Sequence, residues 1–431
     1  MDIGYVNGSL HFIAETFNLD ISQRGHVSSV LLIGAAAGAL FSGFLSKKFG
    51  RRKVLLIAAA IFSVFTIVGI ISPNYETFIL SRFVLGIAVG IASFIAPLYL
   101  SEIAPKKYRG ALIALYQLMI TIGLFLVFLT NSALESTGSW RIMLTVLAVP
   151  SVVMFFGCLT LPRSPRWLIL VGEDEESKVV LKKIRTTDVE ALKEFDEIKQ
   201  TTHKGVSPFA MLRKPFFIKV LLLGMALQAF QQFTGMNAFM YYSTDIFKMA
   251  GFTNPATSTI VIGLLNMLTT FIAIKYVDRF GRKPILYFGL TLLILSCLVV
   301  GTIYIAGVHS EIPKYILLIS CLVYIFGFAC SWGPVAWILC SEIFPQKVRE
   351  IGMTITTIVN WTFVWIVVAY SNVIMGSGVW GKPMLFVSYA IFCIIAIVFL
   401  KLFVPETKGV SLEKIEDNLI SGSKLKDLGQ H

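Results

Sequence analysis

Long apolar stretches alternate with short charged segments along the whole chain. Twelve such stretches can be distinguished, and most reach the roughly 20 residues that a helix needs to cross the hydrocarbon core of a bilayer. They lie near 1–17, 27–46, 54–72, 77–100, 111–134, 142–161, 216–247, 257–277, 284–306, 313–340, 352–375 and 383–404. The pattern predicts an all-α polytopic membrane protein with these stretches as its helices.

Two segments interrupt this pattern. Residues 163–215 carry mixed charge, and the stretches 173–184 and 189–200 within them have amphipathic helical spacing. We expect a cytoplasmic helical linker there, which joins a six-helix bundle over 1–162 to a second bundle over 216–404. The remaining residues, 405–431, are expected to form a cytoplasmic tail, with a short helix over 412–419 and a disordered end rich in Gly, Ser and Lys.

Composition supports membrane insertion. Of the 431 residues, 56% are hydrophobic and only 14% charged, which is too little charge to cover the surface of a soluble protein of this length. The net charge of +12 does not indicate a nucleic-acid partner, because Lys and Arg gather in every second loop between the apolar stretches. By the positive-inside rule these loops and both termini face the cytoplasm, in a multi-pass protein of the cytoplasmic (inner) membrane. The six cysteines show neither metal nor disulfide spacing.

The first apolar stretch is unusually short, because the polar residues Asn18 and Asp20 end it. A helix over this stretch would place Asp2 inside the membrane, where a charged α-amino group beside it would be costly. We therefore expect that the natural chain begins upstream of Met1 and that this sequence lacks the N-terminal part of the first helix. A signal peptide would need a basic N-terminal region and a small-residue cleavage site, and neither is present.

The two halves of the chain repeat the same loop motifs in the same order. The paired motifs are Phe49-Gly50-Arg51-Arg52-Lys53 with Phe280-Gly281-Arg282-Lys283, Ser101-Glu102 with Ser341-Glu342, Arg109 with Arg349, and Pro162-Arg163-Ser164-Pro165-Arg166 with Pro405-Glu406-Thr407-Lys408-Gly409. This repetition predicts a parallel duplication of a six-helix unit. In transporters built this way the substrate site lies between the halves, near the middle of the membrane.

One apolar stretch, 216–247, is rich in amides. Gln228, Gln231 and Gln232 fall near one helical face, and Asn237 and Tyr241 lie about two and three turns further on. Amides both donate and accept hydrogen bonds, so such a stripe suits a ligand made of hydroxyl groups. Polar residues also commonly join membrane helices to one another. From this stretch alone, both interpretations remain open.

Taken together, the motifs resemble one family over essentially the whole chain. The paired loops, the Gln231-Gln232-x4-Asn237 run and the segments Arg163–Arg166 and Pro405–Gly409 are similar to the sugar porter family of the major facilitator superfamily. Within that family the resemblance is strongest to bacterial proton-coupled hexose and pentose symporters. It implies two six-helix bundles related by pseudo-two-fold symmetry, and import of a monosaccharide by proton symport with alternating access.

The resemblance also assigns a sugar site. The matching positions are Gln117, Gln231, Gln232, Asn237, Asn266, Trp337 and Asn360, with Phe328 and Tyr242 expected to line the pocket. The chemistry fits, because amides pair with hydroxyls in either sense and an aromatic face covers the apolar face of a pyranose. In this family the helix that contains Gly333-Pro334 breaks at that point, and its outer half folds over the sugar; proline removes a backbone hydrogen bond there.

Asp2 matches the aspartate that marks the proton-coupled members of the family, and Arg82 is its expected partner. Arginine stays charged, whereas a carboxylate can be neutralised by a proton. Our hypothesis is that protonation of Asp2 releases Arg82 and thereby biases the movement of the two halves. A purely structural Asp–Arg pair is the alternative.

Clustered charges in the cytoplasmic loops match the inner gate of the family. They are Arg51, Arg52, Glu102, Arg109, Arg166, Arg279, Arg282, Glu342, Arg349 and Glu406. Single surface ion pairs contribute only about 0–1 kcal/mol, which suits a gate that must open and close. Two positions depart from the family pattern: Lys47 replaces an Asp that the second copy keeps as Asp278, and Arg163 replaces a Glu. We expect the gate of the first half to be weaker or paired differently.

Other function classes are disfavoured by the sequence. It contains no nucleotide-binding loop, metal-ligand cluster or catalytic triad, so we expect neither an enzyme nor a cofactor other than the coupling proton. A proton-independent facilitator, a transporter-like sugar sensor and a drug exporter are the alternatives. The architecture requires only a monomer. The sequence does not choose among glucose, galactose, xylose, arabinose and a polyol such as inositol, which differ by single hydroxyl or hydroxymethyl groups.

Overall fold

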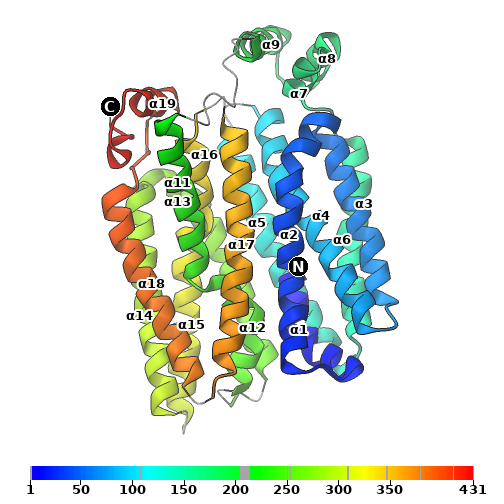
Figure 1. The fold of residues 1–431 in the computed structure, drawn as a ribbon, viewed down its shortest axis with the longest axis vertical. Helices are drawn as coiled ribbons and strands as arrows, with labels where there is room; N and C mark the ends of the chain where they lie inside the picture. The colour runs from blue at the N-terminus through cyan, green and yellow to red at the C-terminus, as the bar shows by residue number, and fades with distance from the viewer. Residues whose placement is uncertain are drawn as a thin grey trace.

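The computed structural model of the protein describes residues 2–105, 109–203, 214–249, 251–252, 254–307, 310–345, 348–378, 380–410 and 412–430. Within these ranges the regular structure is entirely helical, as predicted. Two bundles stand side by side, with the short helices that connect them at one end (Figure 1). Eleven helical segments of the described residues are long and apolar enough to cross a membrane. The first helix is shorter, at 16 residues.

The first bundle contains the helices of the N-terminal half. They are α1 (Asp2–Phe17), α2 (Ile21–Phe49), α3 (Arg51–Ile70), α4 (Tyr75–Ile103), α5 (Arg109–Leu134) and α6 (Trp140–Thr160), with the short 3-10 helix η2 (Glu135–Thr137) before α6. Glycines let α2 and α4 approach closely, since a Cβ at Gly86 would lie 2.1 Å from the Leu31 carbonyl oxygen. Small residues at such contacts are typical of membrane bundles, where backbone proximity replaces the hydrophobic driving force.

The second bundle repeats this arrangement with two of its helices interrupted. Its helices are α11 (Pro215–Phe233), α12 (Met236–Met249), α13 (Pro255–Phe280), α14 (Arg282–Ala306), α15 (Glu311–Cys330), α16 (Trp332–Ile343), α17 (Arg349–Met375) and α18 (Gly381–Phe403). The pairs α11–α12 and α15–α16 each correspond to one predicted stretch.

The break between α11 and α12 changes the predicted helical stripe. Gly235 has a φ of 86°, in the left-handed region that glycine adopts without strain. The uninterrupted pattern predicted that Asn237 and Tyr241 continue the helical face of Gln228. Because of the break, they do not. The second break falls at Ser331 (φ −125°, ψ −91°), directly before the predicted Gly333-Pro334 pair, which lies inside the first turn of α16.

The linker is a small helical unit at the end of the bundles. It contains α7 (Pro165–Leu170), α8 (Asp174–Ile184) and α9 (Asp188–His203), and 204–213 lie outside the described residues. Its own apolar cluster includes Leu181 and Phe195. A buried Arg185–Glu194 pair, with Nε to Oε2 at 2.5 Å, anchors it, because Arg185 Nη1 also donates to the Ile103 carbonyl at the end of α4 (2.9 Å).

The tail is more ordered than predicted. Helix α19 (Leu412–Ile420) agrees with the expected short helix, but the 3-10 helix η3 (Leu425–Asp427) follows it where a disordered end was predicted. Leu428 is fully buried, and Asn418 Nδ2 donates to its carbonyl oxygen at 3.0 Å. The prediction was wrong because it followed the Gly/Ser/Lys composition of this end, whereas the apolar residue Leu428 packs into the core.

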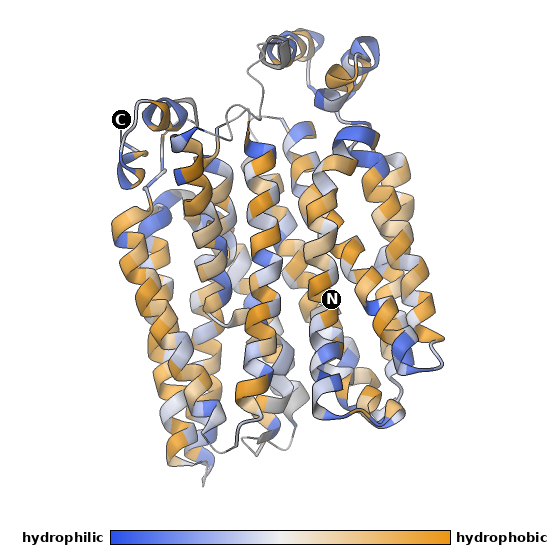
Figure 2. Cartoon of the chain, viewed as in Figure 1, coloured by the Kyte–Doolittle hydropathy of each residue, from blue (hydrophilic) through white to orange (hydrophobic). Residues whose placement is uncertain are grey.

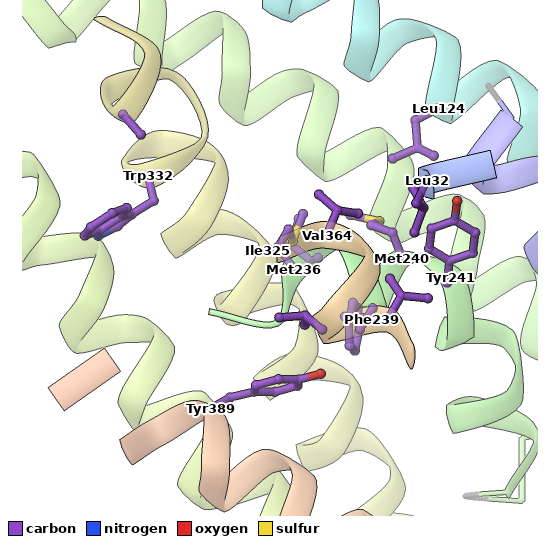
Figure 3. Packing of buried hydrophobic residues seen from close by; sticks show 14 of the residues in the cluster. Leu32, Leu124, Met236, Phe239, Met240, Tyr241, Ile325, Trp332, Val364 and Tyr389 are labelled. Atoms are coloured by element: carbon purple, nitrogen blue, oxygen red, sulfur yellow. The ribbon is translucent and has the colours of Figure 1, made fainter. Parts of the chain in front are cut away.

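Hydropathy is distributed as a membrane protein requires. Apolar side chains face outward along the helices, with Leu40 57% and Phe44 66% exposed, while polar residues gather at the ends and in the linker (Figure 2). The halves meet along α2–α17 and α5–α13, which are equivalent pairs under the duplication. A buried apolar cluster also joins them, and it includes Leu32 and Leu124 of the first half with Met240 of α12 (Figure 3).

We predict that Gly235→Ala destabilises the protein. The left-handed backbone at this position costs a residue with a Cβ about 1–3 kcal/mol, and the new Cβ would lie 2.4 Å from the Tyr389 ring. The thermal unfolding midpoint in detergent should fall. Gly157→Ala is the matched control, because its Cβ would meet no atom within 4 Å and alanine favours a helix by about 1 kcal/mol. Equal midpoints for the two variants would contradict the assigned role of Gly235.

Candidate functional site

Four of the predicted sugar-binding amides are hydrogen-bonded to one another. Gln231 and Gln232 lie in the last turn of α11, Asn237 in the first turn of α12, and Asn360 in the middle of α17. Asn360 Nδ2 donates to Gln231 Oε1 at 2.9 Å, and Gln232 Nε2 donates to the same oxygen at 3.2 Å. Asn237 Nδ2 in turn donates to Gln232 Oε1 at 2.5 Å. The helix break brings Asn237 back to the amides of α11.

Gln231 is the centre of this network and has no unused hydrogen-bonding capacity. Its Oε1 accepts two hydrogen bonds, and its Nε2 donates to the carbonyl oxygens of Trp332 (2.9 Å) and Gly333 (3.1 Å). These carbonyls belong to the first turn of α16, directly after the break between α15 and α16. Gln231 therefore ties the two broken helices together.

The other amides retain groups that can bind a ligand. Gln232 uses one of its two N–H donors, and the side-chain oxygens of Asn237 and Asn360 accept no hydrogen bond within the described part of the chain. An amide can offer two donors and two acceptor positions. Asn237 is partly exposed, whereas Gln232 and Asn360 are buried. The cluster can thus present several acceptors and a donor to one hydroxylated molecule.

Two predicted aromatic residues lie on the helices at the α15–α16 break. Trp337 is on α16, one turn beyond the carbonyls that Gln231 binds, and is partly exposed. Phe328 packs at the start of α16, where a Cβ at Gly333 would lie 3.3 Å from its Cε1. Both side chains are therefore positioned by the same break that Gln231 stabilises.

Three predicted residues are not brought into the amide network. Gln117 on α5 is partly exposed and Asn266 on α13 is buried, and neither side chain makes a hydrogen bond within the described ranges. Their helices are neighbours across the two halves. Tyr242 on α12 is buried and lines a cavity of about 10 Å³ with Tyr389 and other residues of the second half. That cavity is too small for a sugar and is not the predicted pocket.

Gln228 completes the cluster, although it was not assigned a role in sugar binding. Its Oε1 accepts from Asn360 Nδ2 at 2.8 Å, and its Nε2 contacts Cys340 Sγ at 3.6 Å. The amide stripe in the sequence already contained this residue. Its partners could not be read from the sequence, because Cys340 and Asn360 belong to distant helices.

Asn7 is a residue that the sequence analysis missed. It lies on α1, and its Nδ2 contacts the carbonyl oxygens of Met240 (3.0 Å) and Tyr241 (2.8 Å) and Ser243 Oγ (3.1 Å) on α12. Thr244 Oγ1 donates to Asn7 Oδ1. One amide thus fastens the first half to the short helix that carries Asn237. An isolated amide in the first apolar stretch was the only available signal.

The predicted proton-coupling pair is partly described. Arg82 is completely buried in α4, and its guanidinium lies 6.0 Å from the centre of the Tyr5 ring on α1. The helix α1 begins at Asp2, one turn before Tyr5, but the side chain of Asp2 lies outside the described residues. Arg82 therefore faces the part of α1 that contains Asp2.

The predicted charge network of the first half centres on Arg51. Arg51 Nε donates to Glu102 Oε1 (3.1 Å) and Oε2 (2.9 Å), and its Nη2 donates to Oε1 at 2.8 Å. Ser164 Oγ donates to the same carboxylate at 2.5 Å. Arg52 does not join this pair and binds the carbonyl oxygens of Cys158 and Leu159 at the end of α6.

The second half repeats this arrangement with its own residues. Arg282 Nη2 donates to Glu342 Oε1 at 2.8 Å, and Thr407 Oγ1 donates to Glu342 Oε2 at 2.5 Å. Glu406 was predicted to join the charge pairs. Its carboxylate instead accepts the backbone N–H groups of Arg282 (3.0 Å) and Lys283 (2.9 Å), so it caps the N-terminus of α14.

The remaining predicted gate residues are less closely involved. Arg349 donates to the Phe344 carbonyl oxygen at 3.2 Å. Arg166 and Arg279 are exposed and form no ion pair with a described residue. The side chain of Arg109 lies outside the described residues.

The departure at Arg163 changes the first copy of the motif in a specific way. Arg163 occupies the position that Glu406 has in the second copy, where a carboxylate caps a helix. In the first copy no hydrogen bond from a described side chain to the first N–H groups of α3 takes the place of this cap. Arg163 Nη1 pairs instead with Glu176 Oε2 of α8 at 3.0 Å. The substitution thus exchanges a helix cap for a contact with the linker.

Comparison with known proteins identifies relatives along the whole chain. A family model described as "Sugar (and other) transporter" matches residues 2–419. The galactose-proton symporter of Escherichia coli strain K12 is 43% identical over 435 residues, which cover 100% of this chain and 93% of that protein. The arabinose-proton symporter of the same strain is 41% identical over 437 residues, with 100% and 92% covered.

Solved structures agree with this assignment. A structure of the major facilitator superfamily proton:xylose symporter XylE, bound to 6-bromo-6-deoxy-D-glucose, superposes with a TM-score of 0.83 at 29% identity. It covers 99% of this chain and 94% of the other. An inward-open structure of XylE from E. coli has a TM-score of 0.81 at 30% identity, with 96% and 95% covered.

We predict that Gln231→Glu destabilises the protein more than Gln117→Glu does. A carboxylate at position 231 cannot donate to the Trp332 and Gly333 carbonyls, and hydrogen bonds of this kind contribute about 0.5–1.5 kcal/mol each. Gln117 has no such partners among the described residues. Thermal unfolding of the two purified variants without sugar measures the difference. If position 117 proves the more sensitive, Gln231 is not the centre of the network.

Proposed function

The chain belongs to the sugar transporter family, and on this basis we propose that it imports a monosaccharide across the cytoplasmic membrane by proton symport with alternating access. Relatives that match the whole chain are named as proton symporters of galactose and arabinose. The observation that carries the proposal is the amide cluster between the broken helices, which keeps acceptors and a donor unused beside Trp337.

We place the sugar against the C-terminal half. Gln232, Asn237 and Asn360 offer it hydrogen bonds, and Trp337 covers an apolar face of the ring. Gln117 of the first half completes the site when the halves close around it, with Asn266 beside it on α13. Neutral hydrogen bonds of about 1 kcal/mol each are strong enough to select a sugar and weak enough to release it.

The proton acts on the first half in this proposal. Asp2 takes up a proton from the outside and releases it to the cytoplasm, and Arg82 is the partner that responds to its charge. A buried arginine retains its charge, so the carboxylate is the group that titrates. We further propose that the protein works as a monomer with both termini in the cytoplasm, as the distribution of Lys and Arg indicates.

The sugar itself is best identified by direct uptake. We expect cells that express the protein to accumulate at least one radiolabelled sugar from a panel of galactose, glucose, arabinose, xylose and myo-inositol. A protonophore should abolish accumulation above the external concentration, because the proton gradient supplies the energy. Uptake that only equilibrates, with or without protonophore, would instead indicate a facilitator.

We predict that Asp2→Asn uncouples sugar from protons. The amide cannot titrate, so alkalinisation of the medium on sugar addition should disappear, while exchange of labelled for unlabelled sugar across the membrane continues. Glu15→Gln is the matched control, since Glu15 is an exposed carboxylate on the same helix. Undiminished proton uptake in the Asp2 variant would leave the structural Asp–Arg pair as the better interpretation.

A further inference from the structure

Glu350 is an acidic residue of the gate region that the motif comparison did not select. It lies in the first turn of α17, in the second half, and its Oε1 is 3.5 Å from Nη2 of Arg51 in the first half. Glu350 Oε1 is buried and makes no hydrogen bond within the described ranges, so the contact is a charge interaction. The pair joins the two halves directly.

Arg51 is placed to link three helices at this end of the protein. It is only 3% exposed, binds Glu102 of α4 with two nitrogens, and directs Nη1 to the Ser46 carbonyl oxygen of α2 at 3.4 Å. Glu350 adds α17 to this set. A single guanidinium therefore holds a permanent partner in its own half and a second partner across the interface.

The duplicated sequence shows why an acid is needed at position 350. The loop motif has Asp278 in the second copy, whereas the matching residue of the first copy is Lys47. At the residue after the gate arginine, the acid is also in the second copy: Gly110 follows Arg109, whereas Glu350 follows Arg349. Each of the two equivalent interfaces thus has one anion from this pair of positions. The second half supplies both, from Asp278 of α13 in one interface and from Glu350 of α17 in the other.

Helix-end electrostatics explain the exchange. The N-terminus of a helix carries a partial positive charge of about half an elementary charge. Lys47 and Lys48 stand in the last turn of α2, which runs beside α17: a Cβ at Gly43 would lie 3.4 Å from Thr354 Oγ1 near this end. Positive charge near a helix N-terminus repels it, and Glu350 in the first turn of α17 offsets that repulsion. Arg51, Glu102 and Lys47 are the charged groups that act on its carboxylate.

We propose that Glu350 is a positioning residue of the cytoplasmic gate, which supplies from the second half the negative charge that Lys47 has removed from the first. This inference rests on the proposed function, because the gate belongs to the transport cycle. Its consequence is that the Arg51–Glu350 pair joins α3 to α17 at the end of the α2–α17 interface and must separate when the halves move apart. The Glu350 side chain as a whole is 41% exposed, and its contact with Arg51 is long and makes no hydrogen bond, so the pair is weak enough to break in each cycle.

The test compares Glu350→Gln with the same variant carrying Lys47→Asp. Spin labels are placed on the exposed residues Lys53 of α3 and Lys424 of the tail, in protein whose six native cysteines are replaced. Their separation is measured by pulsed electron paramagnetic resonance in the absence of sugar. We expect Glu350→Gln to raise the population with a long separation about two- to fivefold, the range that a partly exposed pair supports. Lys47→Asp should restore the original distribution.

Controls separate this inference from its alternatives. Glu311→Gln removes the carboxylate of an exposed pair with Lys314 and should leave the distances unchanged. Glu350→Asp keeps the charge and is expected to give an intermediate population. It provides a second test if the glutamine variant folds poorly. Distances that do not respond to Glu350→Gln, or that Lys47→Asp does not restore, would overturn the proposal. Because no sugar is present, these outcomes are independent of whether any tested sugar is transported.

Discussion

Backbone groups inside a membrane must be satisfied within the protein, and this constraint organises the site. Two helices of the second half are interrupted, at Gly235 and at Ser331, and an interruption leaves backbone groups without their helical partners. Tyr324 Oη donates to the Thr234 carbonyl oxygen at the end of α11 at 2.5 Å, and Gln231 fastens α11 to the Trp332 and Gly333 carbonyls in the first turn of α16. The side chains that form hydrogen bonds across the breaks thereby also fix the positions of the neighbouring amides. Interhelical bonding and ligand binding were left as alternatives by the sequence; Gln231 carries the first, and in our proposal other members of the same cluster carry the second.

The two halves contribute unequally to the proposed cycle. The amide cluster and its aromatic neighbours belong to the second half, whereas Arg82 and the helix that begins at Asp2 belong to the first. Asn7 joins these parts, because it fastens α1 to α12 beside the amide cluster. In our proposal, a change of charge on α1 reaches the sugar site through this contact. The duplicated architecture thus supports different tasks in its two copies.

Much of the fold followed from the sequence, because long apolar helices with basic loops leave little ambiguity. The helical class, the paired charge motifs and the amide cluster were predicted, and Arg51–Glu102 and Arg282–Glu342 form ion pairs. The sequence could not show that α11 stops at Phe233, since the apolar pattern continues through Gly235 without interruption. It also could not show that Glu406 caps a helix, or that Glu350 meets Arg51, because these contacts depend on which helix ends become neighbours. Comparing motifs within one copy cannot find an acidic residue that the other copy contributes.

The central claim is that the unused groups of the amide cluster bind a sugar between the halves. A structure of the protein determined with its transported sugar tests this most directly. The account predicts sugar hydroxyls within hydrogen-bond distance of Gln232, Asn237 and Asn360, with Trp337 against the ring and Gln231 still bound to the carbonyls of α16. A sugar found elsewhere in the protein, with the amide cluster unchanged and unoccupied, would contradict it.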